Sequence, residues 1–215
     1  NYKDRWHKPE LICALEPFDA LCGFRSAPEA LALLEPLAVD GLDPLRRRLV
    51  DYGVGAGFAW TLETDAARQV VEATAAACQY RDDPAYEWVV KLATQYPGDP
   101  GVIASMLLQY VRLEPMQALY LPAGNLHAYL HGVGIEIMAN SDNVLRGGLT
   151  QKHVDTAELL EVLDFDAEPP PPVQAVESSP GVWTYPTPTA EFRLSRLEVD
   201  ERPVEALRGR HGGGG

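Results

Sequence analysis

The sequence predicts a mainly β protein with an all-helical block inserted into it. Three observations support this fold class. Apolar runs typical of strands occur before residue 26 and again after residue 106, whereas residues 27–96 are rich in alanine and leucine at helical spacing. Residues 96–101 (YPGDPG) end the helical pattern, because proline and glycine interrupt regular structure. Finally, a run of prolines at 169–172 predicts a stiff spacer before a second, smaller β unit.

These patterns divide the chain into an interrupted β domain, a helical insertion, a proline-rich linker and a second β unit that is incomplete. The β domain comprises residues 1–26 and 97–166, and the helical insertion comprises 27–96. The linker is 167–172 and the second β unit is 173–215. Within the first part, residues 11–24 are mostly apolar and contain a turn near Glu16. They predict a strand followed by a helical turn.

Each helix expected in the insertion begins at a proline in its first turn or at a capping threonine or aspartate. These helices are 27–38, one that opens at Asp43 and Pro44, 66–80 after Thr64, and 85–96 after Asp83. Short apolar runs between turn residues predict the remaining elements. They are strands at 107–113, 118–121, 128–131 and 134–139, a short helix at 156–163, and strands at 182–185 and 191–199.

Composition narrows the possible partners. The chain has 215 residues, of which 46% are hydrophobic and 23% charged, as in ordinary globular proteins. Its formal net charge of -13 argues against nucleic acid and against an anionic membrane as partners. A phosphorylated small molecule stays possible, because it needs only a local cluster of lysine and arginine.

The cysteines and the termini bear on the compartment. The three cysteines are widely spaced and form no CxxC pair, which predicts reduced thiols in a cytoplasmic protein. No apolar run approaches the ~20 residues of a membrane span, and no signal peptide is visible. The chain begins at Asn1 rather than methionine and ends in a glycine run, so we expect both ends to be cut.

The densest motif surrounds His127. Residues 121–127 (LPAGNLH) place a proline and a glycine in a tight turn, which brings His127 to the start of the next strand. This arrangement resembles the second cupin motif, PxGxxH, whose histidine binds a metal inside the barrel. The alternative is a histidine that is only part of the core.

Glu136 and Glu10 are the candidate carboxylates. Glu136 lies within an apolar strand, where a carboxylate is costly unless it is paired, bound to metal or functional. The alternative places it on a solvent-exposed face, although Val133, Ile135 and Ile137 already define one face of that strand. Glu10 follows Pro9 and opens the first strand, where a carboxylate is a plausible zinc ligand.

The candidate cations lie in a loop further along. Arg146 stands beside two glycines, where the backbone can approach a ligand closely, and with Lys152 it could bind a phosphate. An exposed loop arginine with no ligand is the alternative.

In this order the segments resemble the type I phosphomannose isomerase family. The resemblance rests on NYKD and HKPE within residues 1–10, ALEPFDALCGFR at 14–25, YPGDPGV at 96–102, and residues 121–150 with their continuation to 165. It covers most of residues 1–165 and is weak beyond the prolines. One departure is Met116, where the family usually has glycine.

The resemblance implies a cupin (jelly-roll) β-barrel, with the start of a second cupin-like unit at the C-terminal end. It implies that Glu10 and His127 are ligands of Zn²⁺. The family completes the site with a Gln-x-His pair, which we expect upstream of Asn1 and which this chain lacks. The family's active-site cleft also includes the residues that match Lys8, Glu136, Arg146 and Lys152.

The reaction implied is the interconversion of mannose 6-phosphate and fructose 6-phosphate through an enediol, which supplies mannose for glycan and GDP-mannose synthesis. Glu136 is our candidate general base, with Lys8 assisting at the oxygens and Arg146 stabilising charge. Arg146 and Lys152 would hold the phosphate. His127 or Lys8 could move protons instead. We expect a cytoplasmic monomer whose partner is a small sugar phosphate.

Two other functions fit parts of the sequence. A non-catalytic module that binds sugar phosphates, or an inactive fragment, would keep Arg146 and Lys152 without a complete metal site. An iron-dependent cupin oxygenase typically needs an HxH pair, and none of the five histidines forms one.

Overall fold

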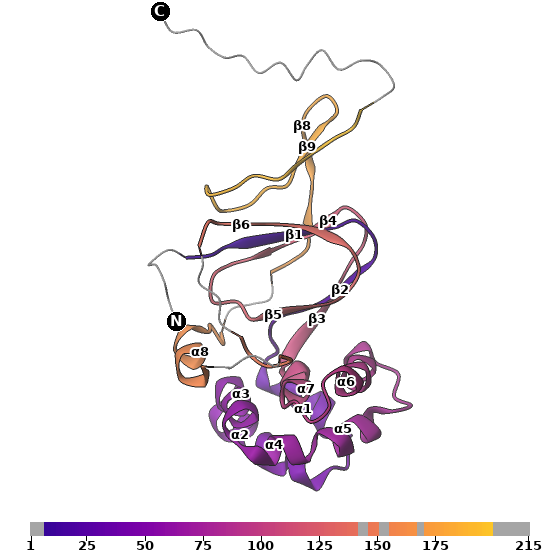
Figure 1. The fold of residues 1–215 in the computed structure, drawn as a ribbon, viewed down its shortest axis with the longest axis vertical. Helices are drawn as coiled ribbons and strands as arrows, with labels where there is room; N and C mark the ends of the chain where they lie inside the picture. The colour runs from indigo at the N-terminus through magenta and orange to yellow at the C-terminus, as the bar shows by residue number, and fades with distance from the viewer. Residues whose placement is uncertain (1–6, 142–145, 151–154, 167–169, 200–215) are drawn as a thin grey trace, which may run out of the picture.

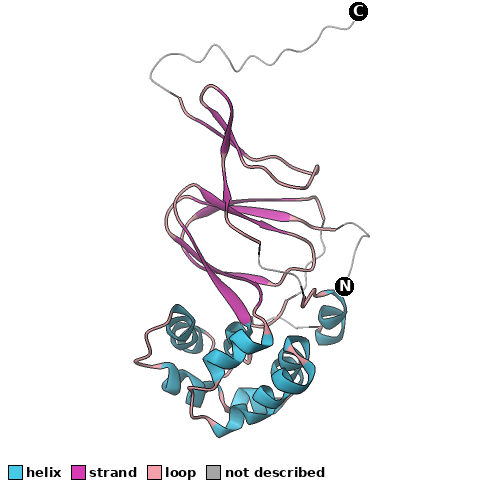
Figure 2. Ribbon diagram, turned by 180° about the vertical axis from the view of Figure 1, so that it is seen from behind, coloured by secondary structure: helices cyan, strands magenta, loops and turns pink. Residues whose placement is uncertain are grey.

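The computed structural model describes residues 7–141, 146–150, 155–166 and 170–199. Two antiparallel sheets lie face to face, helices pack beneath the second sheet, and a small third sheet lies beyond the first (Figure 1). The helices are grouped at one end of the molecule, apart from the strands (Figure 2). Within the described residues, the two facing sheets share no strand pairing that would close a barrel.

In the described part of the chain, ten strands form three sheets. The first sheet has the order β6-β1-β4-β7 and the second the order β3-β2-β5. Their strands are β1 Glu10–Ala14, β2 Phe18–Phe24, β3 Leu108–Leu113, β4 Gln117–Leu121, β5 His127–His131, β6 Gly134–Met138 and β7 Val173–Gln174. The third sheet has the order β10-β9-β8, from β8 Val176–Ser179, β9 Val182–Thr184 and β10 Ser195–Leu197.

The expectation of a helical turn after the first strand is wrong, because residues 18–24 form the strand β2. All seven residues of β2 are buried. Ala20 and Cys22 face the first sheet, whereas Leu21 and Phe24 pack against the helices. A strand covered on both faces loses the alternation of polar and apolar residues, so periodicity could not identify it.

The helical insertion follows its start signals. At Ser26 the side chain and that of Glu29 form a capping box, and the Asp83 carboxylate accepts the backbone N–H of Ala85 at 2.8 Å. The helices are α1 Ala27–Leu34, α2 Asp43–Tyr52, α3 Val54–Glu63, α4 Asp65–Gln69, α5 Val71–Cys78, α6 Pro84–Gln95 and α7 Gly101–Ala104, with 3₁₀ turns at Asp40–Leu42 and Ser105–Leu107.

Two differences from the expected helices have local causes. The predicted helix 66–80 breaks into α4 and α5 at Val70, whose side chain packs on Gly41. Helix α3 was not expected, since Gly55 and Gly57 lower helix propensity. Gly57 is needed there because a Cβ would lie 2.9 Å from a methyl of Leu49.

The elements after the insertion agree closely with those expected. Strands β3 to β6 and helix α8 (Thr156–Val162) lie within two residues of their predicted bounds. Strands β9 and β10 are shorter than predicted, and β7 and β8 were not predicted. Met116 has a φ of 68°, the left-handed conformation for which the family's usual glycine is suited. In the described residues, no helix is both long and apolar enough to span a membrane.

An aromatic cluster joins the helical block to the second sheet. The ring centroids of Phe24 on β2 and Phe58 on α3 are 5.2 Å apart, and Phe165, after α8, lies 4.7 Å from Phe24. Phe58 is completely buried in the largest hydrophobic core. This cluster therefore ties three distant segments together through dispersion and apolar burial.

We expect Phe58→Ala to lower the free energy of unfolding by about 3–5 kcal/mol, because it leaves a cavity in this core. Urea denaturation measures the change. Tyr52→Ala is the matched control, since Tyr52 is 78% exposed and its loss should cost less than about 0.5 kcal/mol. Equal effects of the two substitutions would contradict the role of the cluster.

Candidate metal centre

The turn before β5 sets the position of His127. The Asn125 N–H donates to the Pro122 carbonyl at 3.2 Å, and Gly124 has a φ of 81°. A Cβ on Gly124 would lie 2.9 Å from the Val162 carbonyl oxygen at the end of α8. Glycine is therefore required by both conformation and space, and the turn delivers His127 as the first residue of β5.

Glu10 and His127 meet across the gap between the two facing sheets. Glu10 opens β1 in the first sheet, and its Oε2 lies 3.1 Å from Nε2 of His127. The Lys8 ammonium lies 3.3 Å from the other carboxylate oxygen. Nδ1 of His127 lies 3.1 Å from the Asn125 carbonyl, an arrangement in which Nδ1–H donates and leaves Nε2 for a ligand.

Glu136 extends into the same space from β6. It pairs with Ile12 of β1, and Ile12 is buried between the sheets, so the two side chains share that face. The Tyr129 hydroxyl donates to Oε1 of Glu136 at 2.5 Å. Glu136 is exposed, yet it points toward the other candidates rather than lying on the outer face with Ile135, which is 48% exposed.

These side chains form a cluster suited to a metal. One ligand atom from each of Glu10, His127 and Glu136 lies within 4.8 Å of the others. Imidazole nitrogen with carboxylate oxygen is a donor set that Zn²⁺ accepts. The structure thus brings together the three residues that the sequence singled out in separate strands.

Tyr129 was missed in the sequence. It stands two residues after His127 on a strand, so its side chain must lie on the same face, and that spacing was the available signal. Burial, followed by the hydrogen bond to Glu136, raises the pKa of Tyr129. The phenol therefore stays protonated and remains a donor to the carboxylate.

The charges of Glu10 and His127 stabilise each other. Burial alone would raise the pKa of Glu10, but the hydrogen bond and charge of His127 and the charge of Lys8 lower it. Burial would lower the pKa of His127, but the hydrogen bonds to Glu10 and the Asn125 carbonyl, with the nearby carboxylate charges, raise it above 6.5. Without metal, a proton on His127 therefore compensates for the buried carboxylate.

Of the two candidate phosphate ligands, Arg146 lies within the described residues. Arg146 is half-buried, and among the described residues none forms a hydrogen bond or ion pair with its guanidinium. A Cβ on the next residue, Gly147, would lie 3.0 Å from Leu126, which precedes His127. The Arg146 loop therefore runs beside the start of β5. Lys152 lies outside the described residues.

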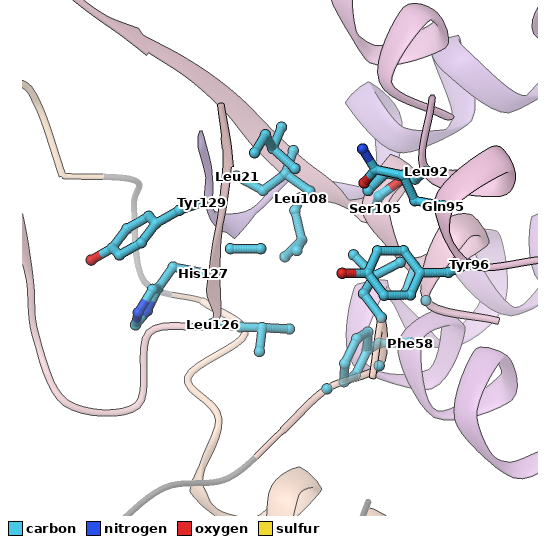
Figure 3. A pocket seen from close by; sticks show the side chains of 17 residues that line it. Leu21, Phe58, Leu92, Gln95, Tyr96, Ser105, Leu108, Leu126, His127 and Tyr129 are labelled. Carbon is cyan, nitrogen blue, oxygen red and sulfur yellow. The ribbon is translucent and has the colours of Figure 1, made fainter. Parts of the chain in front are cut away.

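A pocket of about 200 Å³ lies behind β5, on the side of the helical block. Leu126, Leu108 and Phe58 line it, whereas the side chains of His127 and Tyr129 point away to the opposite side of the strand (Figure 3). The metal cluster and this pocket thus lie on opposite faces of one strand.

The chain is similar to known proteins over most of its length. No family model matches it. It is 34% identical to mannose-6-phosphate isomerase of Escherichia coli K12 over 210 residues, covering 94% of this chain and 53% of that protein. It is 32% identical to mannose-6-phosphate isomerase of Rattus norvegicus over 227 residues, covering 93% and 53%. The chain spans about half the length of these relatives.

Solved structures agree with the sequence matches. A variant of phosphomannose isomerase from Salmonella typhimurium matches with a TM-score of 0.82 at 34% identity, covering 91% of this chain and 51% of that one. A mannose 6-phosphate isomerase bound with zinc and yttrium matches with a TM-score of 0.81, with the same coverage. The resemblance to these isomerases and the expected fold class are confirmed.

We expect the affinity for Zn²⁺ to fall as the pH is lowered, and the fall to begin above pH 6.5. The proton competes with the metal for Nε2 of His127, whose pKa is raised in the metal-free protein. Below that pKa each pH unit should weaken binding about tenfold. A competition titration with a fluorescent chelator between about pH 5.5 and 8 measures it.

Substitution at two histidines of one strand provides the control. His127→Asn should remove the pH dependence together with most of the affinity, whereas His131→Asn, an exposed histidine at the end of β5, should change neither. An unchanged pH profile in His127→Asn would show that another group takes the proton.

Proposed function

We propose that this chain forms part of the active site of a zinc-dependent isomerase that interconverts mannose 6-phosphate and fructose 6-phosphate. The observation that carries the proposal is the cluster of Glu10, His127 and Glu136 between the sheets, in a chain homologous to mannose-6-phosphate isomerases over nearly its full length. Because the chain spans about half of those relatives, the activity belongs to the protein as a whole.

Residue types and spacings in the Salmonella enzyme support the assignment. Its solved variants include alanine replacements of a lysine and a glutamate two positions apart, and of a glutamate and an arginine ten positions apart. In this chain, Lys8 with Glu10 and Glu136 with Arg146 have the same types and spacings.

The residues present fit a zinc ion. Glu10 and His127 offer an oxygen and a nitrogen that already face each other, and the Asn125 carbonyl orients the imidazole. When bound, zinc would polarise the oxygens on C1 and C2 of the sugar as a Lewis acid. Two further ligands are expected from a segment before Asn1.

Glu136 is the proposed general base. Its carboxylate would take the proton from C2 of the aldose to give an enediolate, and would return that proton to C1 to give the ketose, while the hydroxyl proton moves from O2 to O1. Tyr129 holds one carboxylate oxygen by its hydrogen bond, which leaves the other oxygen for the substrate. Lys8, already beside Glu10, would donate a hydrogen bond to a sugar oxygen where negative charge develops.

The phosphate would bind away from the reacting carbons. The Arg146 guanidinium offers a fork of donors that matches phosphate oxygens, and Lys152 is proposed as its neighbour. The net charge of -13 does not oppose this assignment, because only the local charge near the phosphate matters at these distances.

We also propose that the protein works as a cytoplasmic monomer at a step that feeds GDP-mannose synthesis. The three cysteines support a reducing compartment, since all are buried and unpaired.

We expect Glu136→Gln to lower turnover of mannose 6-phosphate by at least about a hundredfold while zinc content is unchanged, because an amide cannot accept the proton. Tyr129→Phe should lower turnover by about tenfold, since it only releases the carboxylate. A coupled assay of fructose 6-phosphate formation measures both, on this chain and on a form extended upstream of Asn1.

The wild-type assay separates the proposal from its alternative. Zinc-dependent turnover in the extended form supports the isomerase, and retained turnover in Glu136→Gln moves the base to another residue. Binding of mannose 6-phosphate without turnover in either form would instead favour a non-catalytic sugar-phosphate module.

A further inference from the structure

We infer that Asp99, in the turn between helices α6 and α7, is a positioning residue, which acts through Arg146 by fixing the loop that follows it. The inference rests on the proposed function, in which Arg146 binds the substrate phosphate. It also assigns a task to the turn between α6 and α7, namely to hold a loop of the active site.

The Asp99 carboxylate accepts three backbone N–H groups. Oδ1 receives the N–H of Gly101 at 2.7 Å and that of Leu149 at 3.2 Å, and Oδ2 receives that of Thr150 at 3.2 Å. One bond closes the turn that contains Asp99, and two cross to the loop. Bonds from a charged acceptor to backbone amides are stronger than bonds between neutral groups.

The loop and the turn approach so closely that side chains are excluded. A Cβ on Gly148 would lie 2.9 Å from the Cα of Gly101, and a Cβ on Gly101 would lie 2.6 Å from the Leu149 nitrogen. Gly148 also has a φ of 118°, which only glycine adopts readily. The pair of glycines therefore allows the carboxylate to reach the loop amides.

The loop beside Asp99 borders both the hydrophobic core and a pocket. Leu149 packs against the largest hydrophobic core, and Gly147, Gly148 and Leu149 also line the pocket of about 200 Å³ behind β5. Leu149 has a φ of 52°, a left-handed conformation that is unfavourable for a residue with a Cβ. Its N–H bond to Asp99 stabilises that conformation.

Loss of these bonds should therefore act on the loop rather than on the metal cluster. Arg146 lies three residues before Leu149, the first loop residue that Asp99 holds, whereas Glu10 and His127 lie on strands of the sheets. A looser loop leaves Arg146 with more conformations, of which fewer meet the phosphate. The expected signature is weaker binding of phosphate with the zinc site intact.

The test compares Asp99→Asn with Asp82→Asn in the zinc-loaded protein, on the chain form that is active. Asp82 is an exposed aspartate just before α6, and its substitution should leave KM, kcat and phosphate inhibition unchanged. Asp99→Asn should raise both KM for mannose 6-phosphate and the inhibition constant of inorganic phosphate about tenfold, with kcat changed less than about twofold.

A double-mutant cycle with Arg146→Gln separates positioning from general damage. If Asp99 acts through Arg146, adding Asp99→Asn to Arg146→Gln should change KM and phosphate inhibition by less than about twofold. Equal effects in both backgrounds, or a loss of kcat and melting temperature without a change in KM, would overturn the inference.

Hydrogen exchange gives a readout that does not depend on turnover. The amides of Leu149 and Thr150 should exchange about tenfold faster in Asp99→Asn, while those of β1 stay protected. Unchanged exchange at both amides would overturn the inference even if KM rises. If the wild-type protein shows neither turnover nor phosphate binding, the proposed function is refuted. Faster exchange of the Leu149 and Thr150 amides in Asp99→Asn would still show, in that case, that Asp99 holds the loop.

Discussion

The sheet β3-β2-β5 is covered on both faces, and the rest of the structure depends on this constraint. One face meets the first sheet and the other meets the helical block (Figure 1). Alternate residues of β5 must therefore serve opposite surroundings: His127 and Tyr129 point to the metal cluster, whereas Ala128 and Leu130 pack toward the helices.

The candidate site combines groups that would be costly to bury singly. A carboxylate between two sheets needs a counter-charge, and here it has an imidazole on one side and an ammonium on the other. The second carboxylate is held by a phenol that cannot neutralise it. The metal-free site is therefore preorganised for a cation at one end and for proton transfer at the other.

The sequence predicted the parts of the site that depend on local chemistry. His127 could be identified because proline and glycine determine its turn, and Glu136 because a carboxylate stands out in an apolar strand. Tyr129 and Asp99 escaped notice because their roles arise from contacts with distant segments, which no local pattern encodes. The strand β2 and the helix α3 were missed for a related reason, since burial on both sides and close helix packing override periodicity and propensity.

The helical block enters and leaves the sheet at one point. The Arg25 N–H donates to the Leu107 carbonyl at 2.8 Å, and Phe24 pairs with Leu108, which lies 84 positions further along the chain. Closing so long a loop from an unfolded chain is entropically unfavourable and slow, whereas a helical block that folds first brings its own ends together. The central sheet can then assemble around a closed insertion, and this topology favours folding of the helices before the strands that carry the chemistry.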